Sequence, residues 1–232
     1  MESQLFVLIA CEESQAECVA FRELGHTAFS CDIQPCRKGM HPEWHIKDDV
    51  TPLLHGGVQF VTEEGKQVIV PRWDLIIAHP PCTYLSKVGA PLLYNAADLF
   101  LSWHGQILHV NSQRYQQMCS GRSFFYECLG AKARYVAVEN PIPMALAGLP
   151  KPTCYACPSW YGVKYTKKTL YGLRNLPPLF AEIDFPGAKS FVSCSRGKYR
   201  SRTFPQMARA IARQWSKYIL DDLNVGECSL IY

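Results

Sequence analysis

The chain has 232 residues and a net charge of +4, and its residues are 48% hydrophobic and 19% charged. This composition excludes a generally disordered chain, allows one sizeable core, and is compatible with a polyanionic partner. The apolar runs are too short for a membrane span, and the first residues lack the basic flank of a signal peptide, so we expect a cytosolic protein with no membrane contact.

The N-terminal part of the chain has the pattern of a βαβ unit. Residues 5–10 form a short apolar run that is typical of a buried parallel strand. Ser14 is expected to cap a helix that stops at Gly25, and residues 27–31 predict a second strand that ends in Asp32. The residues that this helix would bury are Val19, Ala20, Phe21 and Leu24. Strand, helix and strand within about thirty residues indicate a parallel pair of strands.

The middle of the chain adds an insertion and a further strand. Residues 57–70 alternate around Glu64-Gly65, which predicts a small β-hairpin. Residues 73–78 read as a buried strand that runs into His79-Pro80-Pro81-Cys82. Residues 86–111 show no strong period, and we expect a mobile loop with some helix, which fits a lid and equally an ordinary surface loop.

The C-terminal part continues the alternation. Residues 114–129 predict a helix, and residues 135–138 predict a strand that leads into Glu139-Asn140. A Cys/Pro-rich loop near 141–166 is followed by a strand over 169–173. An amphipathic helix over 204–220 has these residues for its buried side: Met207, Ala210, Ile211, Trp215, Tyr218 and Ile219. Together the elements predict one domain over residues 1–232, an α/β fold with an open, mostly parallel, doubly wound sheet.

In such sheets, ligands bind beyond the carboxyl ends of the strands. The polar residues predicted there are Cys11, Glu12, Glu13, Asp32, Asp49, Cys82, Glu139 and Asn140. Asp32 has the spacing of an acid that binds ribose hydroxyls, although a solvated turn is the plainer interpretation. Because no Gly-x-Gly-x-x-Gly follows the first strand, NAD and FAD are disfavoured, and an adenosine ligand without phosphates fits better.

Cys82 and Glu139 are the strongest candidates for catalytic residues. Two prolines before Cys82 hold its thiol in one place, where it can be a nucleophile or a small buried side chain. Glu139 can be desolvated, kept protonated, and used to donate a proton to a ring nitrogen, or it can cap the next loop. His79 is read as a structural hydrogen bonder in preference to a general base.

Two weaker patterns concern metal and nucleic acid. Cys154-x-x-Cys157 is half of a zinc signature; Cys194, His41 and His45 are further ligands only by residue type, and free thiols are the alternative. The segment 196–202 holds four basic residues and one Tyr, which suits phosphate contacts and base stacking but also a solvated loop. The eleven cysteines favour free thiols, a metal site or a catalytic thiol over disulfides.

Several segments, in this order, carry a resemblance to a known family. They are VLIACEESQ with CDIQPC, HIKDDV, WDLIIAHPPCTYLS, YVAVENP, YTKKTLYGLRNLPPL and RSRTFPQMARAIARQW. This combination resembles the DNA (cytosine-5)-methyltransferases, and more closely the short phage-type members. The resemblance implies a Rossmann-like methyltransferase fold, S-adenosyl-L-methionine as cofactor, DNA as partner, and a bacterial or phage-infected cytoplasm.

The resemblance also implies roles for residues. Cys82 would attack carbon 6 of cytosine, and Glu139 would protonate or hydrogen-bond the ring nitrogen, so that carbon 5 accepts the methyl group. The residues implied for the cofactor are Cys11, Glu12, Asp32, Ile33, Asp49, Val50 and Pro80. Those implied for the substrate are Asn140, Pro81, Lys167, Lys168, Arg200 and Arg202. A base in a duplex must be flipped out to be reached.

Three departures from the family leave alternatives open. Cys-Glu-Glu-Ser replaces the glycine-rich cofactor loop, which leaves room for a modified S-adenosylmethionine or a catalytically inactive DNA-binding module. Fewer than thirty residues lie between Leu173 and Ser201, too few for a large target-recognition domain, so a free pyrimidine nucleotide is a second candidate substrate. Lys167-Lys168 stands where the family has an arginine pattern, and lysine offers a point charge in place of a bidentate fork.

Overall fold

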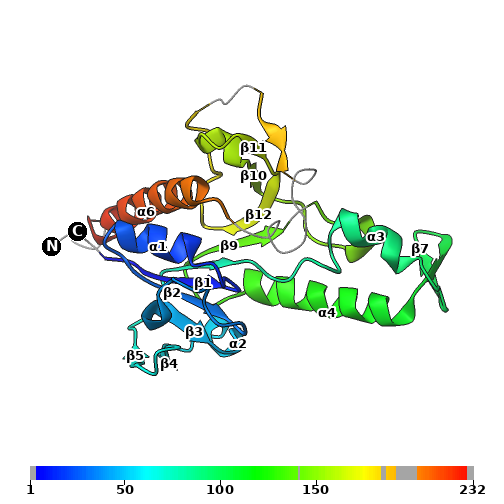
Figure 1. Ribbon diagram of the computed structural model, residues 1–232, viewed down its shortest axis with the longest axis horizontal. Helices are drawn as coiled ribbons and strands as arrows, with labels where there is room; N and C mark the ends of the chain where they lie inside the picture. Colours follow the sequence, from blue (N-terminus) through cyan, green and yellow to red (C-terminus); the bar gives the residue numbers. More distant parts are fainter. Residues whose placement is uncertain (1–3, 141, 184–186, 192–202, 229–232) are drawn as a thin grey trace.

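The computed structural model describes residues 4–140, 142–183, 187–191 and 203–228, and its centre is a seven-stranded sheet (Figure 1). The strands are β1 (Phe6–Ala10), β2 (Thr27–Asp32), β3 (His45–Lys47), β6 (Leu75–Ala78), β9 (Tyr135–Asn140), β10 (Cys154–Ala156) and β12 (Thr169–Arg174). Their order is β10-β12-β9-β6-β1-β2-β3. Strands β3 to β9 run parallel to their neighbours, whereas β12 and β10 add an antiparallel edge. The sheet is therefore open and mostly parallel, as expected.

Helices cover both faces of this sheet, which makes it doubly wound. Helices α1 (Ala16–Glu23) and α6 (Pro205–Cys228) lie side by side on one face, and α4 (Ser112–Leu129) lies on the other (Figure 1). In β1, Val7 and Ile9 face the first layer and Leu8 the second, and all three are fully buried. A strand covered on both faces is apolar at every position, which explains the continuous apolar run in the sequence.

The remaining elements are short. They are α2 (Thr51–Leu54), α3 (Ala90–Leu93), the 3-10 helices η1 (Pro42–Trp44), η2 (Lys87–Gly89), η3 (Ala145–Ala147) and η4 (Pro158–Tyr161), and the strand pairs β4 (Gln59–Val61) with β5 (Gln67–Ile69), β7 (Leu99–Trp103) with β8 (Gln106–Val110), and β11 (Tyr165–Thr166) with β13 (Lys189–Ser190). Strands β10 and β11 and helix η4 lie in the stretch that the sequence predicts as a Cys/Pro-rich loop.

The hairpin predicted over residues 57–70 is confirmed, and a second hairpin corrects the prediction of a loop over 86–111. Strands β7 and β8 pair around His104 and Gly105, whose φ angles of 48° and 77° are those of a tight hairpin turn. The prediction missed this hairpin because both of its faces carry apolar residues, such as Phe100 and Leu101, so the alternation is hidden. The hairpin projects beyond the end of α4 (Figure 1).

The helix faces agree with the prediction at most positions and differ at two. Met207, Ile211 and Trp215 of α6 are buried, but Tyr218 is 39% exposed. In α1, Leu24 lies past the end of the helix and is 41% exposed. No helix among the described residues is long and apolar enough to cross a membrane.

Candidate active site

The sheet has a switch point between β1 and β6, where ligands bind in open α/β folds. From β1 the chain proceeds to β2 and β3 on one side, and it returns to β6 and β9 on the other side. The His79 amide donates to the Ala10 carbonyl at 2.9 Å, which ties the ends of β6 and β1 together. The residues predicted for function therefore converge on the carboxyl edge on both sides of this point.

The turn after β1 is built around a carboxylate that faces inward. Cys11 and Gln15 adopt left-handed φ angles of 59° and 55°, which fold the turn back on itself. The Glu12 carboxylate accepts hydrogen bonds from the Glu17 amide at 2.8 Å and the Cys18 amide at 3.3 Å. Burial and the charge of Glu17 raise the pKa of Glu12 to about 7. Glu12 therefore caps the N-terminus of α1 from beneath.

Ser14 was expected to be this cap and contributes less. Its hydroxyl lies 3.5 Å from the Ala16 amide, which is longer than the 2.8 Å contact of Glu12. The Gln15 side chain, fully buried, bonds Ser30 and the His41 backbone and so joins the turn to the loop after β2.

Two further acids stand at neighbouring strand ends. Asp32 ends β2 and accepts from the Gln34 amide at 2.8 Å, and Asp49, beyond β3, accepts from the Thr51 amide at 2.9 Å. Burial raises the pKa of the Cys11 thiol, and the charges of Asp32 and Asp49 raise it further, so both acids lie near the β1 turn. Beside Asp32, the side chain of Ile33 is 70% exposed.

Two other residues predicted for the cofactor are buried. Val50 packs into the core next to Asp49, and Pro80 lies against the end of β6. Their side chains therefore form the wall of this edge, whereas the polar groups of Asp32 and Asp49 stand at its surface.

Cys82, Glu139 and Lys167 share one electrostatic environment on the other side of the switch point. Cys82 begins a turn after Pro81, and its carbonyl accepts from two amides at 3.0 Å. Burial raises the pKa of its thiol, the charge of Glu139 raises it further, and the charge of Lys167 lowers it. The thiol and the carboxyl thus lie near enough for the charge of one to act on the other, and the raised pKa keeps the thiol protonated at neutral pH.

The two lysines of the sequence motif point in different directions. Lys167 is half-buried and acts on both Cys82 and Glu139. Lys168 is exposed, and its ammonium lies 4.5 Å from the ring centre of Tyr155 on the edge strand β10. Asn140, the last residue of β9, is buried. Of the two candidates the structure brings only Lys167 to the thiol.

Glu139 is not kept protonated by its burial, contrary to expectation. Burial raises its pKa, but the nearby imidazole of His79 and the charge of Lys167 outweigh that effect and lower its pKa below the ordinary value. His79 lies between two acids: its Nε2 is 3.1 Å from Glu17 Oε2 and its Nδ1 is 3.6 Å from Glu139 Oε2. Glu17 is not among the residues that the sequence predicts for the site, since an acid in the first turn of a helix usually faces solvent.

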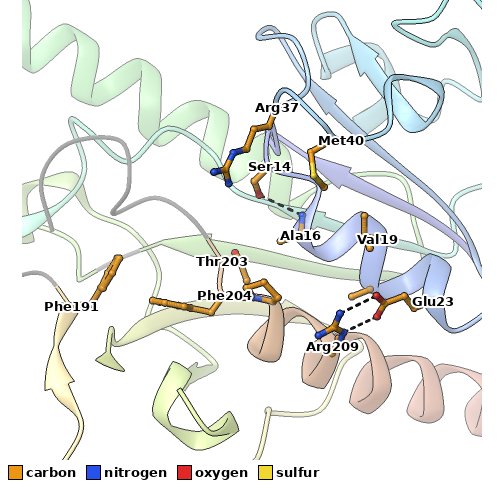
Figure 2. A pocket seen from close by; sticks show the side chains of 12 residues that line it. Ser14, Ala16, Val19, Glu23, Arg37, Met40, Phe191, Thr203, Phe204 and Arg209 are labelled. Carbon is orange, nitrogen blue, oxygen red and sulfur yellow. Dashed lines mark hydrogen bonds and ion pairs between the residues drawn. The ribbon is translucent and has the colours of Figure 1, made fainter. Parts of the chain in front are cut away.

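Two hollows adjoin these groups. A cleft of about 400 Å³ lies between α1 and the start of α6, with Ser14 and Arg37 near one end and the Glu23–Arg209 ion pair at the other (Figure 2). A smaller cavity is lined by Glu139 and Lys167. Thr203 and Phe204 line both, so the cleft and the Glu139 cavity are adjacent.

The other predicted sites receive less support. Within the described ranges, no group of three or more His, Cys, Asp and Glu side chains has the arrangement of a metal site. The Cys157 sulfur instead accepts from the Ser159 hydroxyl at 3.3 Å. Cys194, Arg200, Arg202 and the rest of the basic segment lie outside the described residues.

Comparisons with known proteins give distant likenesses only. No family model matches the chain, and no curated protein matches its sequence. Among solved structures, a candidate DNA modification methyltransferase encoded within an E. coli prophage is 12% identical, with a TM-score of 0.37 over 73% of this chain and 46% of that chain. A mutant of Spodoptera frugiperda DNMT2 is 13% identical, with a TM-score of 0.36 over 74% and 50%. The chain thus spans about half the length of these structures, and its own residues must support any function.

Proposed function

We propose that this protein is an S-adenosylmethionine-dependent methyltransferase that acts on carbon 5 of cytosine in DNA. The observation that carries the proposal is the shared environment of Cys82, Glu139 and Lys167 beside the switch point of the sheet. A thiol, a carboxyl and an ammonium are the groups needed to attack a pyrimidine ring, to engage its ring nitrogen and to balance the charge that develops.

The residues on the other side of the switch point fit the proposed cofactor. Asp32 offers a carboxylate suited to ribose hydroxyls, Asp49 a second one suited to an amino group, and the exposed Ile33 an apolar surface for a purine ring. The Glu12 oxygens already accept from the first amides of α1, so a phosphate finds no free donor at these two positions. These groups suit a nucleoside without phosphates, such as S-adenosylmethionine.

The chemistry follows from the ionisation of the thiol. When S-adenosylmethionine is bound, it supplies an electrophilic methyl group. The pKa of Cys82 is raised overall, and the charge of Lys167 opposes that rise and so favours the thiolate. The thiol would lose its proton to water, and the thiolate would form a bond to carbon 6 of the cytosine. Glu139, at the wall of the neighbouring cavity, would hold the ring nitrogen and shift electron density to carbon 5. Loss of the carbon 5 proton to water and release of the thiolate by β-elimination would then restore the aromatic ring.

The proposal is tested by trapping the protein on DNA that contains 5-fluorocytosine, with S-adenosylmethionine present. A covalent complex that survives denaturing electrophoresis and maps to Cys82 by mass spectrometry is the expected result. Cys82→Ser should give no complex, and Cys36→Ser, a second half-buried cysteine outside the site, should give the same yield as the wild type. A complex that forms equally well with Cys82→Ser would refute the mechanism.

The short connection between β12 and α6 favours one alternative substrate. Only residues 175–204 separate these elements, so a free pyrimidine nucleotide is a second candidate. Parallel assays with dCMP and with duplex DNA, read by mass spectrometry of the nucleosides, separate the two and also reveal any added group other than methyl. Calorimetry with S-adenosylmethionine distinguishes both from an inactive DNA-binding module, because a blocked cofactor site should give no heat.

A further inference from the structure

A line of three ionisable side chains runs from α1 to the thiol site. Glu17 comes from α1, His79 follows β6, and Glu139 comes from β9. The imidazole contacts Glu17 through Nε2 at 3.1 Å and Glu139 through Nδ1 at 3.6 Å. The exposed fractions of the three side chains are 0%, 13% and 14%, so water has little access to the line.

Burial of the Glu17 carboxylate is unfavourable for the free energy of folding. The packing of the core gives no reason for a carboxylate at this position. Its Oε1 is buried and has no hydrogen-bond partner within the described part of the chain, although its Oε2 contacts His79. An uncompensated buried carboxylate is strongly unfavourable, and a neutral side chain would pack with less cost. The cost is reduced only if His79 carries a positive charge.

The charges around His79 favour that protonated form. Burial lowers the pKa of the imidazole, but Glu17 and Glu139 raise it well above the ordinary value. Glu12 is the third acid near the imidazole, and the charge of Lys167 acts on Glu139. Tyr171, the phenol near both Glu17 and Glu139, has a strongly raised pKa because it is buried, and it stays neutral.

Glu139 itself has no proton to give at neutral pH, because its pKa lies below the ordinary value. An acid that must engage a ring nitrogen therefore needs a donor, and the His79 Nδ1–H faces its Oε2. Lys167 is the other cation that acts on Glu139, but an ammonium holds its proton more tightly than an imidazolium.

We propose, on the basis of the proposed function, that His79 is the proton reservoir of Glu139 and that Glu17 is the positioning residue that keeps the reservoir charged. As the Cys82 thiolate forms its bond to carbon 6, the Nδ1–H bond of His79 breaks and an O–H bond forms on Glu139. The same proton then passes from that oxygen to nitrogen 3 of the ring. His79 is left neutral until carbon 5 takes the methyl group, when the nitrogen 3 proton returns through Glu139 to His79. β-Elimination then breaks the carbon 5–hydrogen and carbon 6–sulfur bonds, and the carbon 5 proton passes to water as the one proton that the reaction releases, so that atoms and charge balance.

The first measurement uses the protein without ligands. NMR of ¹⁵N-labelled histidine in the wild type should show the His79 ring as imidazolium at neutral pH. Glu17→Gln keeps the shape of the side chain but removes its charge, and it should lower the titration midpoint of His79 by about one pH unit or more. A neutral His79 ring in the wild type at neutral pH would overturn the inference, whether or not any variant folds.

The second measurement is the pH profile of single-turnover methyl transfer to DNA. In Glu17→Gln, the alkaline limb should move to lower pH by the same interval as the NMR midpoint. His79→Asn should lower the rate about 100-fold or more, in the range of general acid catalysis, and should leave KM for DNA little changed. The matched control is His55→Asn, an exposed histidine that pairs with Glu127 at 2.8 Å, and it should behave as the wild type.

The outcomes separate this inference from the function on which it rests. If the wild type neither methylates DNA nor forms the 5-fluorocytosine complex, the proposed function fails, while the NMR titration still reports the Glu17–His79 pair. If the wild type is active but Glu17→Gln moves the NMR midpoint without moving the alkaline limb, or if His79→Asn keeps the full rate, then His79 is structural and the relay is wrong.

Discussion

Glu12, the buried acid that caps α1, makes the free energy of unfolding depend on pH. A single substitution can separate this dependence from that of the other titrating groups. Burial and the charge of Glu17 raise the pKa of Glu12 from 4.5 to about 7. Between these values the unfolded chain releases the proton while the folded protein keeps it, so the free energy of unfolding falls as the pH rises. The difference between 4.5 and about 7 corresponds to about 3 kcal/mol, at about 1.4 kcal/mol for each pH unit.

Glu12→Gln removes this dependence and keeps an oxygen for the cap. The amide oxygen can still accept from the Glu17 amide, the shorter of the two contacts, but the side chain no longer titrates. We expect the variant to gain about 3 kcal/mol on the wild type as the pH rises from about 5 to about 8. Urea unfolding followed by circular dichroism at intermediate pH values measures the two midpoints and slopes.

The comparison is made between the two proteins because His79 titrates in both. Its pKa is raised, so its contribution is also lost as the pH rises, and to first order it cancels in the difference. Glu23→Gln is the matched control: this exposed acid pairs with Arg209, which lowers its pKa, so the control should not gain on the wild type with rising pH. If Glu12→Gln and the wild type differ in their free energy of unfolding by the same amount at about pH 5 and about pH 8, the reasoning is refuted.

Two more predictions address the thiol and the sheet edge. Lys167→Met should slow alkylation of Cys82 by iodoacetamide about tenfold, because the thiol pKa rises when the cation is lost. Lys168→Met, the control, should leave the alkylation rate unchanged, because this ammonium lies over Tyr155. Mass spectrometry of the Cys82 peptide measures both rates. Arg174→Met should cost about 3 kcal/mol in urea unfolding, because the guanidinium donates to three carbonyls at and beyond the end of α4. An Arg174→Met protein as stable as the wild type would show that these carbonyls find other donors.

The sequence was sufficient to predict those strands that helices cover on both faces of the sheet. Parallel strands covered by helices have no polar face, so the runs that became β1, β6 and β9 could be found from composition alone. The hairpin of β7 and β8 could not be found in this way, because Phe100 and Ile107 are exposed apolar residues and hide the alternation. Its turn also has His104 where Asn or Asp is usual.

The position of the site could be predicted from the sequence, because the carboxyl ends of parallel strands meet at one edge of the sheet. Cys82 and Glu139 could be expected to meet, because each follows a strand of the same parallel sheet. The sequence does not reveal the protonation state, which depends on a group from another layer. Glu17 reaches His79 only because α1 packs over the switch point, and no pattern in a single sequence encodes that distance. The expectation of a protonated Glu139 was wrong for this reason.

The inward-facing turn after β1 also limits which small molecules the edge of the sheet can accept. In many α/β proteins the first helix leaves its amide hydrogens open, and phosphorylated metabolites dock there. Here the Glu12 oxygens already accept from the Glu17 and Cys18 amides, so an incoming phosphate would meet no free donor at these two positions. The abundant nucleoside triphosphates and dinucleotides of a cell would therefore compete poorly for this edge. The selectivity against them comes from the Glu12 side chain in the turn itself.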